Sequence, residues 1–153
     1  MSKKITLPIR FSLAISAALI AYFLILSLLG LHTNPIYSLF NGVITAFGIY
    51  EAIKYYKLEK GSEFDFSSGF TVGIVTGFIA TLIFTLFFGI YAGNLNPDFL
   101  HTLISQWEDT YNTSLGSVIF VVALMGFATT VVITLSFMQL FKESWNPKKR
   151  KKE

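Results

Sequence analysis

The sequence predicts an all-α membrane protein in which four transmembrane helices form an antiparallel bundle, and three observations lead to that prediction. Only 14% of the 153 residues are charged, whereas a soluble domain usually carries about 25%. Hydrophobic residues make up 53%. The charges are also bunched, so that residues 11–50, 66–97 and 110–141 contain none. Segments of this kind belong in lipid, and the length corresponds to a single domain.

The lengths of the charge-free segments predict the number of helices. A helix needs about 20 apolar residues to cross a bilayer. The first segment is long enough for two helices and is interrupted at Asn34-Pro35, a pair typical of an N-cap and the first helical residue. Gly61 suits the end of the second helix. Each of the other segments allows one helix. The expected helices are 8–31, 35–60, 67–93 and 114–142.

The positions of the basic residues predict the orientation. All 12 Lys and Arg lie at the start of the first helix, at the end of the second, or in the C-terminal tail, and residues 94–113 contain none. Because Lys and Arg are enriched on the cytoplasmic side, both termini are predicted to be cytoplasmic. The first apolar stretch is too long for a signal peptide and lacks a small-residue cleavage site, so we expect an uncleaved helix.

A row of small residues runs through the third helix at intervals of four. In lipid, glycine lets two helix backbones approach closely, and threonine can add a hydrogen bond. Since each step advances the row by about 40°, the row suits a right-handed crossing, and we predict that it packs against another helix. Ser38, Gly42 and Ala46 of the second helix are one candidate mate, and a second protein is the alternative. The row consists of Gly69, Gly73, Gly77, Thr81, Thr85, Gly89 and Gly93.

A short helix is predicted in the loop between the third and fourth spans, over residues 97–109. Asn96-Pro97 repeats the helix-start pattern, and the apolar residues that follow have helical spacing. Such a helix lies flat in the headgroup layer. Its apolar face would comprise Phe99, Leu100, Leu103, Ile104 and Trp107. The polar residues on the other side could form an external metal or acid–base site, but one His with three carboxylates is ordinary on a wet face. They are Asp98, His101, Glu108 and Asp109.

Five consecutive basic residues stand near the C-terminus: Lys148, Lys149, Arg150, Lys151 and Lys152. A nucleic-acid patch is one interpretation of such a run. On a four-span protein, the run more simply determines topology and contacts anionic lipids at the cytoplasmic face. We therefore expect the lipid bilayer as a partner, and no nucleic acid.

No set of residues for catalysis is evident. The absence of Cys excludes disulfides, thiol nucleophiles and Cys-ligated metals, and there are only two His. The deepest ionisable residue, Glu51, lies one turn from Lys54, and we expect the two to pair at the membrane interface. The sequence thus predicts no enzyme activity, no cofactor and no metal.

Two segments carry a resemblance to a known family: Gly61-Ser62-Glu63-Phe64-Asp65-Phe66-Ser67-Ser68-Gly69-Phe70 and Asn96-Pro97-Asp98-Phe99-Leu100. Through them, the chain from the loop between the second and third spans onward resembles the domain-of-unknown-function family 4199. The resemblance covers most of residues 50–141, and the first span matches only as a hydrophobic segment. It implies a four-span inner-membrane protein, mostly found in Bacteroidota, and adds no catalytic residue. A looser association with polyprenol-phosphate glycosyltransferases suggests a partner.

Two functional hypotheses from different classes follow. The first is a non-enzymatic subunit of a homo-oligomer or a larger complex in a bacterial inner membrane, because small-residue packing surfaces are abundant. The second is a small transporter or lipid-handling protein, linked through the resemblance to polyprenol-phosphate glycosyl transfer. Identifying what co-purifies from native membranes would distinguish them.

Overall fold

The computed structural model describes residues 3–105 and 114–141, and every regular element in these ranges is helical. Four of the helices are long and apolar enough to cross a membrane. The chain is therefore an integral, multi-pass membrane protein, and the predicted all-helical class with four spans is confirmed.

The first helix, α1 (Lys3–Leu28), begins and ends earlier than the expected range of 8–31. Near its start it runs through Pro8, the sixth helical residue, which has no backbone N–H to donate to the preceding turn. At its end Gly30 has a φ of 70°. The Leu31 amide donates to the Leu26 carbonyl at 2.9 Å, which is the usual termination by a left-handed glycine. The apolar run continues past this stop, and for that reason the sequence suggested a longer helix.

The second helix, α2 (Pro35–Lys60), has a side-chain cap at its start and a glycine at its end. The Asn34 Oδ1 accepts a hydrogen bond from the Ile36 amide at 3.0 Å. Gly61 has a φ of 54° and donates its amide to the Lys57 carbonyl. A short 3-10 turn, η1 (Gly61–Glu63), then leads to the third span.

The third helix, α3 (Phe66–Ile90), starts at Asp65, whose Oδ2 accepts from the Ser68 amide at 3.2 Å. Hydrogen bonds from Ser68 also lower the pKa of the Asp65 carboxyl. At its other end α3 passes into a π-helical segment, η2 (Tyr91–Leu95), closed by a 2.9 Å hydrogen bond from the Asn96 amide to the Tyr91 carbonyl. The short helix α4 (Pro97–Ile104) follows, and the last helix is α5 (Leu115–Phe141).

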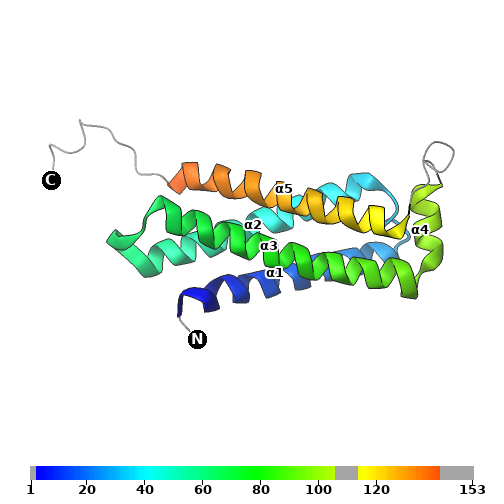
Figure 1. The fold of residues 1–153 in the computed structure, drawn as a ribbon, viewed down its shortest axis with the longest axis horizontal. Helices are drawn as coiled ribbons and strands as arrows, with labels where there is room; N and C mark the ends of the chain where they lie inside the picture. The colour runs from blue at the N-terminus through cyan, green and yellow to red at the C-terminus, as the bar shows by residue number, and fades with distance from the viewer. Residues whose placement is uncertain (1–2, 106–113, 142–153) are drawn as a thin grey trace.

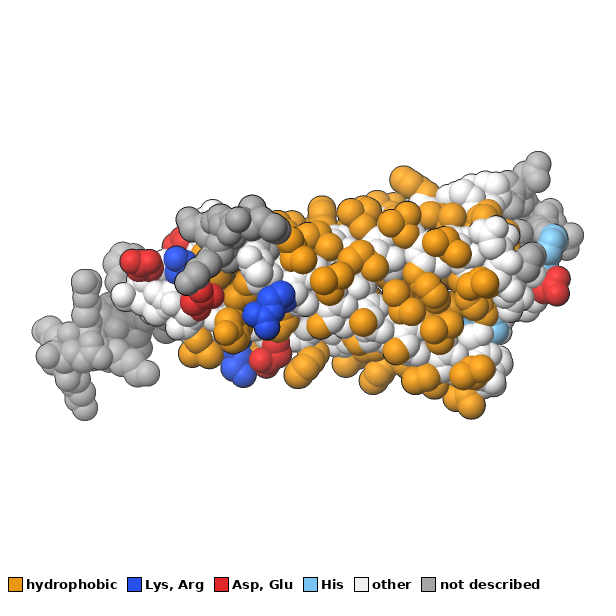
Figure 2. Space-filling view, turned by 90° about the horizontal axis from the view of Figure 1, so that it is seen from below, with side chains coloured by type: hydrophobic (Ala, Val, Ile, Leu, Met, Phe, Trp, Pro, Cys, Tyr) orange, Lys and Arg blue, Asp and Glu red, His pale blue; other side chains and the backbone are white. Residues whose placement is uncertain are grey.

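The four spans lie side by side along the long axis of the molecule, and α4 runs across one end (Figure 1). The central helix is α3, which packs against α1, α2 and α5, while α1 and α5 lie on opposite sides of the α2–α3 pair. Of the four spans, α3 is the most buried and α5 the least. Hydrophobic side chains cover the middle of the surface, and the charged ones gather mostly at one end, here named the basic end (Figure 2).

Candidate functional site

The small-residue row of α3 lies against α5 of the same chain. A Cβ atom added to Gly73 would be 2.5 Å from the Cγ2 of Thr134, and one added to Gly77 would be 2.5 Å from the Oγ1 of Thr130. Real Cβ atoms do not come this close to other atoms. Any side chain at these two positions would therefore push the helices apart.

Near the middle of the interface the glycine belongs to α5 and the threonine that faces it belongs to α3. Gly126 of α5 faces Thr81 of α3, and a Cβ atom on Gly126 would be 2.5 Å from the Thr81 Cγ2. Toward the ends of the row, which continues into η2 at Gly93, the glycines face longer α5 side chains. These pairs are Gly69 with Met138, Gly89 with Ile119 and Gly93 with Leu115. The contacts thus continue along the whole length of the row.

The α5 side of this interface is not among the sequence-based predictions, although the sequence contains a signal for it. Gly126, Thr130, Thr134 and Met138 are also four residues apart, so they share one slanting face of a helix. The α3 row and this α5 row have the same spacing, and that match is the signal that the two helices pack against each other.

Several threonine hydroxyls are buried in the bundle without a hydrogen-bond partner among the described residues. They belong to Thr76, Thr85, Thr130 and Thr134. Three of these residues are 0% exposed: Thr76, Thr130 and Thr134. Leaving a buried hydroxyl unpaired costs about 1–3 kcal/mol.

The small residues of α2 are not the mate of the α3 row. Ser38 is exposed, and a Cβ atom on Gly42 would have no neighbour within 4 Å. Where α2 does approach another helix closely is at Gly48, which lies against Ile15 of α1. Ser38 and Gly42 therefore lie on a surface that the described chain leaves open, and Ala46, one turn further on, is half-buried.

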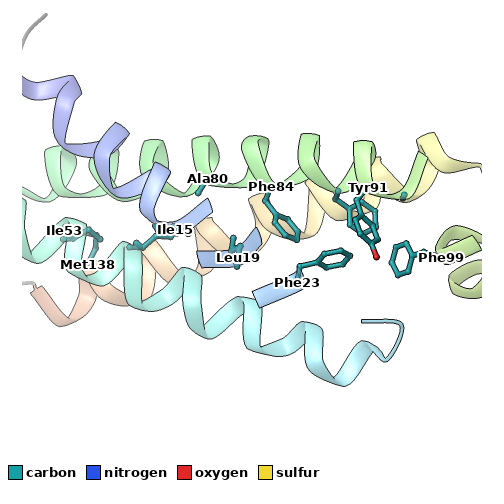
Figure 3. Close-up of a cluster of buried hydrophobic side chains, with 12 residues drawn as sticks. Ile15, Leu19, Phe23, Ile53, Ala80, Phe84, Tyr91, Phe99 and Met138 are labelled. Atoms are coloured by element: carbon teal, nitrogen blue, oxygen red, sulfur yellow. The ribbon is translucent and has the colours of Figure 1, made fainter. Parts of the chain in front are cut away.

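An aromatic cluster closes the end of the bundle opposite the basic end, with Phe23 at its centre (Figure 3). The Phe23 ring makes edge-to-face contacts with Tyr91 at 4.9 Å and with Phe84, Phe88 and Phe99 at 5.9 to 6.3 Å between centroids. Pairs of this geometry are favourable beyond the area that they bury. The cluster joins α1, α3, η2 and α4.

His32, in the turn between α1 and α2, is part of this cluster. Its ring stacks on Phe99 with the centroids 4.8 Å apart and meets Phe23 and Tyr91 edge to face. Both ring nitrogens are buried and have no hydrogen-bond partner among the described residues. Burial lowers the pKa of His32 below its ordinary value of 6.5.

Tyr91 ties the π-helical segment to α1 and to the start of α4. Its hydroxyl lies 2.5 Å from the Ser27 Oγ and accepts a hydrogen bond from the Asn96 Nδ2 at 3.3 Å. Asn96 in turn accepts from the Phe99 amide at 3.2 Å and caps α4. A π-helical turn shifts the side-chain register by one residue, and here it occurs where Tyr91 joins the cluster.

The predicted surface helix is only partly as expected. Phe99 is 3% exposed and is covered by the bundle rather than by lipid, and Leu103 packs against the same core. Leu100 is half-buried. The reason is that the end of the bundle offers an aromatic surface. The side chain of Ile104 lies outside the described part of the structure, as do Trp107, Glu108 and Asp109. Of the residues proposed for an external site, Asp98 and His101 lie on the exposed side of α4.

At the basic end, the lysines of α2 are held by neighbouring groups. Lys54 pairs with Glu51 at 3.2 Å, as the sequence analysis expected, and lies over the Tyr50 ring. Lys57 donates to the Phe141 carbonyl at 3.2 Å, which fastens the end of α5. The basic run 148–152 falls outside the described residues.

Residues 10–118 match a family model described as Protein of unknown function (DUF4199). The match extends from α1 through α4 into the start of α5. No curated protein and no solved structure matches the chain. The chemistry available to these surfaces must therefore follow from their own geometry.

Proposed function

Because the chain belongs to this DUF4199 family of proteins of unknown function, its role has to be argued from its surfaces, and we propose that it is a non-enzymatic membrane subunit. It associates through α2 with a second copy of itself or with another membrane protein. The basic end is cytoplasmic, the membrane is a bacterial inner membrane, and the run Lys148–Lys152 contacts anionic lipids there.

The open small-residue stripe of α2 supports this proposal. Ser38, Gly42 and Ala46 lie one turn apart and could admit a partner backbone, since nothing within 4 Å occupies the space beside Gly42. In lipid, small residues favour helix association, because they let two backbones approach closely. The α3 row contributes nothing here, because α5 already covers it.

The test is a crosslinking experiment on α2. The chain has no Cys, so Ser38→Cys provides a single reporter that forms an inter-chain disulfide if two α2 helices meet. Adding Gly42→Ile should abolish the crosslink and the dimer seen by light scattering. Val43→Ile, at an exposed position beside the stripe, is the matched control and should leave both intact.

Two other results bear on the same proposal. If Gly42→Ile instead releases a stoichiometric membrane protein that co-purifies with the wild type, the subunit role holds with a different partner. If the wild type is monomeric without a partner, or if Gly42→Ile and Val43→Ile behave alike, the proposal is wrong.

A second candidate, a small transporter, is favoured by the buried threonine hydroxyls. Unpaired hydroxyls in the interior of a bundle are what a polar path needs, whereas they only destabilise a packing interface. Thr130→Val removes the hydroxyl and keeps the shape. For a packing interface, we expect an unchanged or higher free energy of unfolding. A loss of stability together with loss of solute uptake in vesicles would favour the transporter.

A further inference from the structure

An open groove of about 430 Å³ lies between α1 and α2 near the basic end. Leu7, Phe11 and Ala14 of α1 form an apolar wall, and Tyr55 of α2 faces it with its ring centroid 6.1 Å from that of Phe11. Two charged side chains, Arg10 and Glu59, line the same groove. The groove therefore combines an apolar surface with one positive and one negative group.

Among the charged side chains that the structure describes at this end, Arg10 and Glu59 differ from the rest in forming no ion pair or hydrogen bond, with each other or with a third residue. The other described charged groups there are engaged in the pairs Lys54–Glu51 and Lys60–Glu63, in the Lys57–Phe141 hydrogen bond and in the Asp65–Ser68 cap. Two opposite charges thus stand free in one groove, and both are exposed.

The position of the groove along α1 places it at the level of the lipid headgroups. From Phe11 to Leu28 the helix carries no charge. This length corresponds to about 27 Å of helix, close to the roughly 30 Å thickness of the hydrocarbon layer. Arg10 therefore lies at the boundary of the hydrocarbon, and Phe11 and Ala14 lie on its apolar side.

We propose that the α1–α2 groove binds one phospholipid whose headgroup carries both a phosphate and a primary ammonium, the chemistry of phosphatidylethanolamine. The Arg10 guanidinium donates to the phosphate, for which its planar fork is well suited. The Glu59 carboxylate accepts from the ammonium, and an acyl chain lies along Phe11 and Ala14. A purely anionic headgroup leaves Glu59 unpaired, and a quaternary ammonium has no N–H to donate.

The test is lipid retention by the purified full-length protein, measured by native mass spectrometry. The probes are phosphatidylethanolamine, phosphatidylglycerol and phosphatidylcholine with identical acyl chains. The wild type should bind the ethanolamine lipid about tenfold more tightly than the other two, which is the effect of one charge-assisted hydrogen bond. Arg10→Gln should weaken binding of every phospholipid, whereas Glu59→Gln should remove only the preference for ethanolamine.

Glu63→Gln is the matched control, since Glu63 is an exposed carboxylate at the same end that pairs with Lys60 outside the groove. It should bind lipid as the wild type does. Arg10→Gln and Glu59→Gln should unfold at the wild-type temperature, because neither side chain forms an ion pair or hydrogen bond with a described residue. Glu63→Gln should do the same, because it loses only an exposed 3.8 Å ion pair with Lys60, and such pairs contribute little to stability. Equal binding of the three lipids by the wild type would overturn the proposal, as would a preference for phosphatidylglycerol or equal effects of Arg10→Gln and Glu63→Gln. The site is independent of association through α2, so Gly42→Ile should not change the lipid preference.

Discussion

At Gly77 the absence of a side chain sets the distance between α3 and α5. The space that a Cβ atom would need is taken by Thr130, whose Oγ1 would be 2.5 Å away. Gly42 of α2 is the opposite case, because the same atom would meet nothing within 4 Å. Two chemically identical positions in one protein therefore differ only in what they face.

Gly77→Ala is expected to lower the free energy of unfolding by about 1–3 kcal/mol, the usual effect of overpacking. Gly42→Ala should change it by less than about 1 kcal/mol. Reversible unfolding in detergent, followed by circular dichroism, measures both. Combining Gly77→Ala with Thr130→Ala should recover part of the loss, since the second change removes the atoms that the new methyl group meets. Equal effects of the two glycine substitutions would show that the interface is looser than described.

His32 makes the stability of the aromatic cluster depend on pH. Burial lowers the pKa of His32 in the folded protein below 6.5, so the unfolded chain binds the proton more readily. Its contribution to stability is complete above pH 6.5 and is lost as the pH falls through the lowered pKa. The rings that face it, Phe23, Tyr91 and Phe99, offer no negative charge to stabilise a protonated imidazole.

His32→Phe keeps a ring in the cluster and removes the titration. We expect the wild type to lose thermal stability between pH 7 and pH 5 and the variant to lose less. His101→Ala, on the exposed side of α4, should keep the wild-type dependence. Parallel pH profiles of wild type and His32→Phe would contradict the account of the cluster.

At the scale of the element, α4 depends on the bundle for its position. The helix has eight residues, too few to be stable alone in water. Phe99, 3% exposed, is its deepest contact with the bundle. The helix is therefore attached mainly by one ring inserted among the aromatic side chains of α1, α3 and η2.

Phe99→Ala should release α4 while the spans stay folded. Removing a buried phenyl ring destabilises by about 3–5 kcal/mol, which exceeds what a two-turn helix can offset. Hydrogen exchange of residues 97–105 is expected to accelerate, with little change in α3. Thr102→Ala, on the exposed side of the same helix, provides the control. Unchanged protection in Phe99→Ala would mean that other contacts hold α4.

The ends of a helix could be predicted from the sequence where the residues that cap the helix are adjacent to it in the chain. Asn34, Pro35 and Gly61 mark both ends of α2, and the structure shows them in those roles. Gly30 is an equally local signal for the end of α1, but the apolar run continues past it and predicts a longer helix. The spacing of the α3 row indicates a face that packs closely against another helix, but it does not indicate which helix that is. In the same way, the periodicity of the sequence indicates that α4 has an apolar side. It does not indicate that Phe99 is buried, because the side chains that bury it belong to residues distant in sequence.

For the whole molecule, the fold places the α2–α3 turn and the helix α4 at opposite ends of the bundle. The turn at Gly61–Glu63 lies at the basic end, and α4 lies across the other (Figure 1). The orientation that we propose puts α4 outside the cell. Since the chain has no Cys, a single introduced thiol reports on one location.

Ser105→Cys should react with a membrane-impermeant thiol reagent added to intact cells, and Ser62→Cys should react only after the membrane is permeabilised. Both serines are exposed, so the membrane alone controls access. Mass-tag labelling and gel shift measure the reaction. The opposite pattern would reverse the proposed orientation.

The pairing of α3 with α5 also sets an order for biosynthesis. Synthesis of α3 is complete at Ile90, but synthesis of α5, the helix that covers its glycine face, is complete only at Phe141. A ribosome needs about 3–10 s to add these roughly 50 residues. During that interval α3 presents an uncovered glycine face to the lipid and to any other helix nearby. A chain interrupted before α5 would keep that face open, so premature termination yields a product prone to pair wrongly in the membrane.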